Sequence, residues 1–237
     1  MKRIVFTIPD KGLLVVIRSG ATTNKKISGG GKLVQTYTFS MSQYHLANSG
    51  AQITMKQFFA LDEANCLDCP YSGNSGNAGC YTHKYMQYSG FLSMLRSIKL
   101  EELGPLTRSK GGDIVEMCYG KYVRFGTYGE PSLMPISLVE AMVYVAKTWT
   151  GYTHQWSKDW ASSYGRYFMA STHNDEESSK AKDLGYRSFI SVIPDKKVSG
   201  INCPASSEQG YKSNCEKCGL CSGMLGKGKK NIWILEH

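Results

Sequence analysis

The chain has 237 residues, of which 28 are Lys or Arg and 19 are Asp or Glu, giving a formal net charge of +9. Hydrophobic residues make up 41% of it, which is enough for a packed core and excludes an intrinsically disordered chain. The longest apolar runs, such as Gly12–Ile17, are too short to span a membrane. The N-terminal apolar run ends at Pro9, too early for a signal peptide, so we expect a cytoplasmic protein without a membrane partner.

The N-terminal part of the chain is rich in β-branched and aromatic residues, separated by stretches of Gly, Ser and Lys. This pattern is typical of strands joined by turns. Strands are predicted at Val5–Ile8, Leu13–Ile17, Leu33–Ser40 and Gln52–Ala60. We expect residues 1–51 to form a β-rich segment that packs on the rest of the protein.

Helical and strand patterns alternate in the remainder of the chain. Helices are predicted at Tyr85–Leu100, Ile136–Trp149, Ser157–Tyr164 and Asp175–Leu184. Strands are predicted at Tyr122–Gly126, Gly151–Trp156, Tyr167–Ser171, Tyr186–Ile193 and Asn231–His237. Short connections between alternating elements imply a parallel sheet. The predicted fold is therefore α/β, with a partial or complete parallel (βα) barrel, TIM-barrel-like, over residues 52–200 and a cysteine-rich segment plus a last strand over residues 201–237.

The eight cysteines fall into two groups and one lone residue, Cys118. The reducing cytosol disfavours disulfides, so clustered cysteines there indicate metal ligands or catalytic groups. The lone Cys118 is expected to be a small buried hydrophobic residue.

The C-terminal group consists of Cys203, Cys215, Cys218 and Cys221, a C-x2-C-x2-C run preceded by a remote Cys-Pro. Ferredoxin-like chains hold a [4Fe-4S] cluster in this way, because two-residue gaps let a tight loop direct three thiolates at three irons. A four-cysteine zinc site is the alternative, although zinc sites usually combine two separate pairs.

The first group consists of Cys66, Cys69 and Cys80, with ten residues between the second and the third. Three thiolates can hold three irons of a cubane and leave the fourth iron open to a small ligand. A fourth ligand from Cys118, His83 or His45 would instead complete a closed site holding zinc or an iron–sulfur cluster.

The three-cysteine loop is followed, after the next predicted strand, by Gly129-Glu130-Pro131. This arrangement resembles the radical S-adenosylmethionine (SAM) superfamily. The resemblance implies that Cys66, Cys69 and Cys80 hold a [4Fe-4S] cluster whose open iron chelates SAM, and that Gly129 and Glu130 border the SAM. It also allows a second [4Fe-4S] cluster after the barrel, at the C-terminal group. The spacing here is C-x2-C-x10-C, whereas that superfamily typically has C-x3-C-x2-C.

The chain also resembles a group of uncharacterised cysteine-rich phage-encoded proteins. These share the Cys-Pro…Gly-Cys-Tyr loop and the closing Cys-Pro…C-x2-C-x2-C segment that are found here. This second resemblance implies a phage protein that works in the host cytoplasm.

Polar residues mark the predicted strand ends, where parallel barrels place their functional mouth. His154 and Arg124 are the candidate catalytic residues, and Ser171 joins Gly129 and Glu130 as a candidate cofactor-binding residue. His154 is a candidate proton donor or ligand, because an imidazole titrates near neutral pH. The other polar strand-end residues are Tyr128, Gln155, His173, Ser191, Glu236 and His237.

The expected function is that of an iron–sulfur protein, either a redox protein or a radical-SAM-like oxidoreductase or lyase acting at the barrel mouth. Its partners would be a small-molecule substrate or an electron-transfer protein, which the positive charge would attract if that protein is acidic. The alternative is a non-enzymatic, zinc-stabilised module that binds nucleic acid through the same charge.

Overall fold

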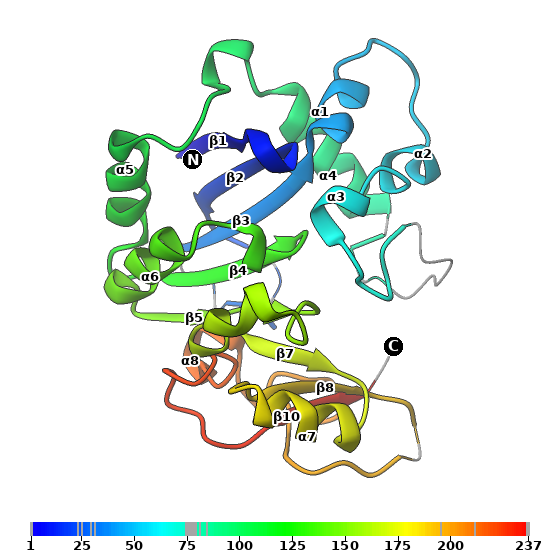
Figure 1. The fold of residues 1–237 in the computed structure, drawn as a ribbon, viewed down its shortest axis with the longest axis vertical. Helices are drawn as coiled ribbons and strands as arrows, with labels where there is room; N and C mark the ends of the chain where they lie inside the picture. Colours follow the sequence, from blue (N-terminus) through cyan, green and yellow to red (C-terminus); the bar gives the residue numbers. More distant parts are fainter. Residues whose placement is uncertain are drawn as a thin grey trace.

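The computed structural model describes residues 2–22, 24, 26–28, 30, 32–73, 80, 82–83, 85–194, 196–210 and 212–235, which form two five-stranded sheets (Figure 1). The first sheet has the order β1 (Arg3–Ile8), β2 (Leu13–Gly20), β3 (Leu33–Ser40), β4 (Tyr122–Tyr128), β5 (Thr148–Thr150). The second has the order β6 (Tyr152–Thr153), β7 (Met169–Thr172), β8 (Ser188–Val192), β10 (Ile232–Leu235), β9 (Ile201–Asn202).

The strand directions divide the fold into a three-stranded antiparallel part and a parallel part. β1, β2 and β3 pair antiparallel, whereas β3, β4 and β5 pair parallel, and every pairing in the second sheet is parallel. The predicted α/β class and parallel pairing are confirmed. A complete barrel is not formed by the described residues. The edge strands are β1 and β5 in the first sheet and β6 and β9 in the second, and among the described residues no ladder joins one sheet to the other.

The two sheets meet at Gly151, the single residue between β5 and β6. Its N–H donates to the carbonyl of Cys221 at 3.2 Å, and its carbonyl accepts from the N–H of Met169 at 3.0 Å. A Cβ at this position would lie 2.5 Å from the Phe168 ring. Glycine is therefore required where the chain passes from one sheet to the other.

The helices surround these sheets (Figure 1). They are α1 (Met41–Ala47), α2 (Met55–Phe59), α3 (Glu63–Cys66), α4 (Tyr85–Arg96), α5 (Arg108–Cys118), α6 (Ile136–Val145), α7 (Asp175–Asp183) and α8 (Cys215–Cys218). Short 3-10 helices are η1 (Pro9–Lys11), η2 (Leu100–Glu102), η3 (Pro131–Leu133) and η4 (Asp159–Arg166).

In two predicted elements, part of the stretch has the opposite secondary structure. The strand predicted at Gln52–Ala60 is wrong, because this stretch contains α2. Thr54 caps that helix by accepting from the N–H of Gln57, and the Gln57 side chain accepts from the N–H of Thr54 in return. The helix predicted to reach Trp149 ends at Val145, and the following residues form β5 beside β4.

Two apolar clusters cover the opposite faces of the first sheet. Val15, Val123 and Phe125 belong to the cluster that includes residues of α5 and α6, whereas Leu14 and Phe39 belong to the cluster that includes residues of α1 and α4. Neighbouring strand residues alternate between the two clusters because their side chains point to opposite faces. Cys118 is fully buried in the first cluster, as its prediction as a small hydrophobic residue requires.

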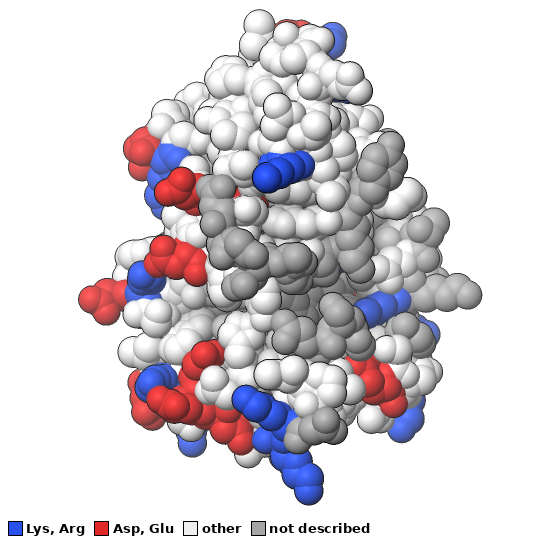
Figure 2. Space-filling model, turned by 90° about the vertical axis from the view of Figure 1, so that its right-hand side faces the viewer, with Lys and Arg blue, Asp and Glu red and all other residues white. Residues whose placement is uncertain are grey.

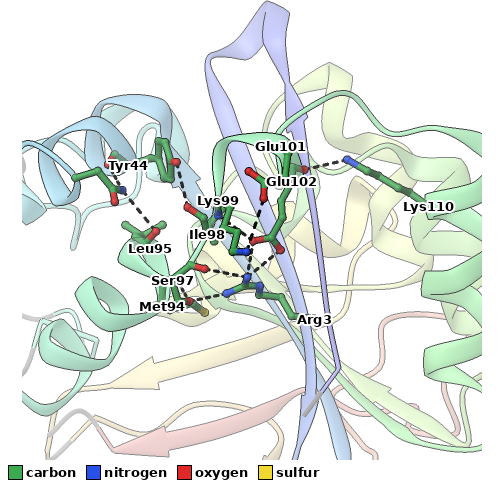
Figure 3. Close-up of polar contacts among 11 residues, drawn as sticks. Arg3, Tyr44, Met94, Leu95, Ser97, Ile98, Lys99, Glu101, Glu102 and Lys110 are labelled. Carbon is green, nitrogen blue, oxygen red and sulfur yellow. Dashed lines mark hydrogen bonds and ion pairs between the residues drawn. The ribbon is translucent and has the colours of Figure 1, made fainter.

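An arginine on β1 holds the segment that leads from α4 toward α5 (Figure 3). Arg3 donates from Nη2 to both carboxylate oxygens of Glu102, at 2.7 and 2.8 Å, and from Nη1 to the hydroxyl of Ser97. These charge-assisted hydrogen bonds hold the segment between α4 and α5 against β1, the edge strand of the first sheet. Within the described part of the chain, no helix has the length and apolar character needed to cross a membrane.

Candidate metal centres and strand-end site

The two cysteine groups lie at opposite ends of the parallel strands. α3, which ends at Cys66, lies toward the arrowheads of β3 and β4, whereas α8 lies beside the start of β5 (Figure 1). At the first end, the N–H of Glu130 donates to the carbonyl of Asn65 at 2.7 Å. At the other end, the main chain at Gly219 packs against Thr148. The molecule therefore offers two separate thiol sites.

The four C-terminal cysteines surround one cavity. Cys203, Cys215, Cys218 and Cys221 line a cavity of about 40 Å³, which is also lined by Tyr152, Phe189 and Ile232 among others. The structure thus brings together the four cysteines that the sequence grouped, although the loop of residues 204–214 separates Cys203 from Cys215 along the chain. Among the described residues, no three Cys, His, Asp or Glu side chains converge closely enough to hold a single metal ion.

The backbone of this loop is fitted closely to the rest of the protein. Asn214 caps α8 by accepting from the N–H of Lys217 at 3.0 Å, and Gly219 ends the helix at a φ of +58°. A Cβ on Gly219 would lie 2.5 Å from the Thr148 hydroxyl, and one on Gly223 would lie 2.6 Å from the main chain of Tyr167. Both glycines are needed for this approach, since neither site has room for a side chain.

A buried arginine also shapes the cysteine loop. Arg187 is only 5% exposed and donates to the carbonyls of Leu220 at 3.0 Å and Gly223 at 3.1 Å, and also to the carbonyl of Lys230. One planar guanidinium, on the residue directly before β8, thereby binds carbonyl acceptors on either side of Cys221.

Burial raises the pKa of Cys203, Cys215 and Cys221. The positive charge of Arg124 acts in the opposite direction on Cys215, and that of Lys26 on both Cys203 and Cys215. Arg124, predicted at the barrel mouth, is therefore close to the C-terminal cysteine site. Because ligation requires thiolates, metal binding here would release protons.

The three cysteines of the first group are half-buried and close enough to affect one another. Burial, followed by the negative charges of Asp62, Cys69 and Cys80, raises the pKa of Cys66 well above its ordinary value. Burial likewise raises the pKa of Cys69 to about 12. Of the suggested fourth ligands, Cys118 lies in the apolar core and His45 is exposed on α1, whereas His83 lies beside Cys80.

His83 interacts with a buried carboxylate and with a thiol. Asp62 is fully buried and lies 3.3 Å from Nε2 of His83, and the imidazole also hydrogen-bonds to Cys80. Burial works against the Cys80 thiolate, but hydrogen bonds from His83 and Thr82 outweigh it, so the pKa of Cys80 is lowered. The other two cysteines of the group lack such an imidazole contact in the described structure.

The Gly129-Glu130 turn runs between the end of β3 and the cysteine loop. Gly129 has a φ of +74°, and a Cβ there would lie 2.4 Å from the carbonyl oxygen of Thr38. The buried Glu130 carboxylate accepts three hydrogen bonds. Two come from Ser132, from its N–H at 3.0 Å and from its hydroxyl at 2.7 Å, and the third comes from the N–H of His154 at 3.1 Å. Burial raises the pKa of Glu130, although these hydrogen bonds act against the rise.

His154 belongs to an aromatic group at the ends of β6 and β7. Its ring centroid lies 6.2 Å from that of Tyr71 and 6.4 Å from that of His173, and the Tyr71 hydroxyl is 3.2 Å from Nδ1 of His173. Burial lowers the pKa of His154 to about 4. Its Nε2 is buried and has no hydrogen-bond partner among the described residues.

Tyr71 is the residue at this site that the sequence did not single out. It lies between Cys69 and Cys80, and its position directly after Cys69-Pro70 was the only available signal. The neighbouring Asp68 forms an ion pair with Lys158, so the cysteine loop contacts the chain beyond β6 as well. Ser171 lies on β7, and its carbonyl accepts from Nε1 of Trp156 at 3.0 Å. Glu236 and His237 lie outside the described residues.

The face that carries the first cysteine loop has charges of both signs. Figure 2 shows Lys and Arg interspersed with Asp and Glu over its described residues. On this face they form no continuous basic surface of the kind that follows a phosphate backbone. A scan against protein-family models, a search of curated proteins and a search of solved structures each found no match.

Proposed function

We propose that this chain is an iron–sulfur protein in which Cys203, Cys215, Cys218 and Cys221 hold a [4Fe-4S] cluster. The observation that carries this proposal is that the four side chains line one cavity of about 40 Å³. The apolar lining from Phe189 and Ile232 would restrict water around the sulfurs, and the positive charges of Lys26 and Arg124 would stabilise the thiolates.

The arrangement of the thiols favours a cluster over zinc. In a tetrahedral zinc site all four sulfurs lie about 2.3 Å from one ion and so about 4 Å from one another. In a cubane each thiolate binds a different iron, so the four ligands surround a volume instead of a point. Among the described residues no three such side chains converge on a single-ion site, and the four cysteines that line a common cavity therefore fit the second geometry better. The zinc-stabilised module remains the alternative.

We further propose that Cys66, Cys69 and Cys80 hold a second cluster with an open iron, and that the parallel strands act as a partial, radical-SAM-like barrel. The supporting observation is the contact of the Gly129-Glu130 turn with α3, which ends at Cys66. Such a cluster, when bound, supplies the electron that cleaves SAM. The reaction class would then be that of an oxidoreductase or lyase.

In this proposal the protein's own residues orient the ligands. Glu130 receives three hydrogen bonds and holds the turn in place, and the neutral His154, with its pKa of about 4, offers a buried Nε2 to a substrate hydrogen bond. Ser171 would line the same mouth from β7. Arg124 would act at the C-terminal site, where its charge favours the Cys215 thiolate.

Anaerobic purification tests the cluster proposal. We expect a brown protein with broad absorption near ~400 nm and about four irons for each occupied cluster site. A colourless protein that contains only zinc would overturn the proposal and support the zinc-stabilised module. Retention of a labelled oligonucleotide by that zinc form would then favour its nucleic-acid function.

A separate measurement tests SAM binding. The electron paramagnetic resonance spectrum of the reduced protein should change when SAM is added, because a ligand on the open iron alters its coordination. An unchanged spectrum would reject the SAM proposal and leave an iron–sulfur redox protein with an electron-transfer partner.

A further inference from the structure

The first cysteine site contains a hydrogen-bonded chain that runs from a buried carboxylate to a sulfur. Asp62 is fully buried, and its two oxygens accept from the N–H of Gly73 at 3.0 and 3.1 Å. One of these oxygens lies 3.3 Å from Nε2 of His83, and the His83 imidazole hydrogen-bonds to Cys80.

The His83 imidazole is held by a ring that packs on its face as well as by the carboxylate at its edge. The ring of Phe59 lies 4.0 Å from the ring of His83, centroid to centroid, with 32° between their planes. Phe59 is buried against the core formed with α4. The ring therefore has an apolar wall and a carboxylate partner, which together restrict its rotation.

The three cysteine sulfurs of this site have different hydrogen-bond partners. Cys66 is approached by the side-chain amide of Asn65 at 3.6 Å, and Cys69 by the main chain of Tyr71. Cys80 has the hydroxyl of Thr82 at 2.9 Å in addition to His83. An N–H donor backed by a carboxylate is the strongest of these, because it carries part of an ionic interaction.

Hydrogen bonds to cysteine sulfurs are one of the factors that set the reduction potential of an iron–sulfur cluster. A donor stabilises the reduced cluster more than the oxidised one, since reduction adds negative charge that spreads onto the sulfurs. We propose that Asp62 and His83 form a positioning pair that directs a hydrogen bond at the sulfur of Cys80 and raises the reduction potential of the cluster bound there. This inference rests on the proposed function of the first cysteine site.

Two substitutions of His83 test the pair in the full-length, cluster-loaded protein. His83→Leu removes the donor but leaves an apolar side chain against Phe59, whereas His83→Gln retains an N–H donor. We expect His83→Leu to shift the reduction equilibrium of the first cluster about tenfold toward the oxidised form, which is ~59 mV for a one-electron couple. His83→Gln should recover part of this shift. A titration followed by electron paramagnetic resonance measures both.

The control is His45→Leu, which removes an exposed imidazole from α1 and should leave the potential unchanged. A wild-type potential in His83→Leu would overturn the inference. If His83→Leu fails to retain iron, His83→Gln decides: recovery of iron and potential by Gln supports the hydrogen bond, and an equal loss in both variants contradicts it.

A further variant distinguishes failure of the inference from failure of the proposed function. Substitution of Cys66, Cys69 and Cys80 by Ala removes the first site entirely. If this triple variant binds as much iron as the wild type, the first cluster does not exist and the proposed function of that site is wrong. If the triple variant loses about four irons while His83→Leu keeps its potential, only the role of the Asp62–His83 pair is rejected.

Discussion

The N–H of Glu130 donates a hydrogen bond of 2.7 Å to the carbonyl oxygen of Asn65, and this bond joins the end of β4 to α3. It places the Gly129-Glu130 turn directly beside the helix that ends in Cys66. Two motifs that are distant in the sequence are thereby held against each other, and the geometry of the first thiol site depends on how tightly this turn packs.

Replacing Gly129 by Ala should therefore damage the fold more than the same change at Gly120. Both glycines have positive φ, so each alanine variant carries a strain of about 1–2 kcal/mol. Only at Gly129 would the new Cβ also collide with Thr38, at 2.4 Å, whereas Gly120 has no atom within 4 Å, so a further ~1–3 kcal/mol is expected. Denaturant unfolding of the two variants measures the difference, and equal losses of stability would contradict the packing argument.

Substituting Cys218 by Ala should lower the iron content of the C-terminal cluster by between about one and about four atoms per chain, because the iron that loses its thiolate is released first and the rest of the cluster can follow. Cys118→Ala is the matched control, since Cys118 is buried in the apolar core and belongs to neither group. It should keep all its iron and lose only about 1 kcal/mol of stability. Iron analysis of both variants provides the check, and full iron in Cys218→Ala would show that the site is assigned wrongly.

The unfolding free energy should fall as the pH is lowered from about 6.5 toward 4, in part because of His154. Its pKa is lowered from 6.5 to about 4 in the folded protein, so the unfolded chain takes up a proton first. The slope from this one group is at most about 1.4 kcal/mol per pH unit. His154→Asn should flatten this part of the profile, and His45→Asn, which replaces an exposed imidazole on α1, is the matched control. Identical acid profiles for wild type and His154→Asn would refute the buried neutral state of His154.

The iron-free protein should lose stability as the pH rises from about 9 toward 12. The pKa of Cys69 is raised from 9.0 to about 12 by burial, so the unfolded chain loses this proton before the folded one does. The contribution of this thiol to the free energy of unfolding is fully present below pH 9. The Cys69→Ser variant should therefore lose less stability than the wild type as the pH rises above 9. Urea midpoints at pH 8, 9 and 10 measure the difference. A profile that is as steep in Cys69→Ser as in the wild type would argue against the buried thiol.

Local sequence patterns predicted much of the fold. The strand predicted at Leu33–Ser40 has those bounds, and the helix predicted at Asp175–Leu184 differs from α7 by one residue, because each has a clear periodicity and a turn signal at its end. Gln52–Ala60 was predicted wrongly because its β-branched and aromatic residues resemble a strand, while the Thr54–Gln57 capping interaction stabilises a helix. Side-chain capping competes with intrinsic propensity and is hard to weigh from sequence.

The sequence by itself grouped the closely spaced cysteines, since short spacings bring Cys66 near Cys69 and bring Cys215, Cys218 and Cys221 near one another. Cys80 and Cys203 are separated from their groups by longer loops and reach them through the tertiary structure. Only the tertiary structure decided what else each site contains. Arg124 lies on β4 and was predicted as a candidate mouth residue, but its charge acts on Cys215 at the other end of the strands. Asp62 and His83 meet at Cys80 because Gly73 and Phe59 hold them there. Such contacts depend on how distant segments pack, and packing is a property of the whole chain that no local pattern encodes.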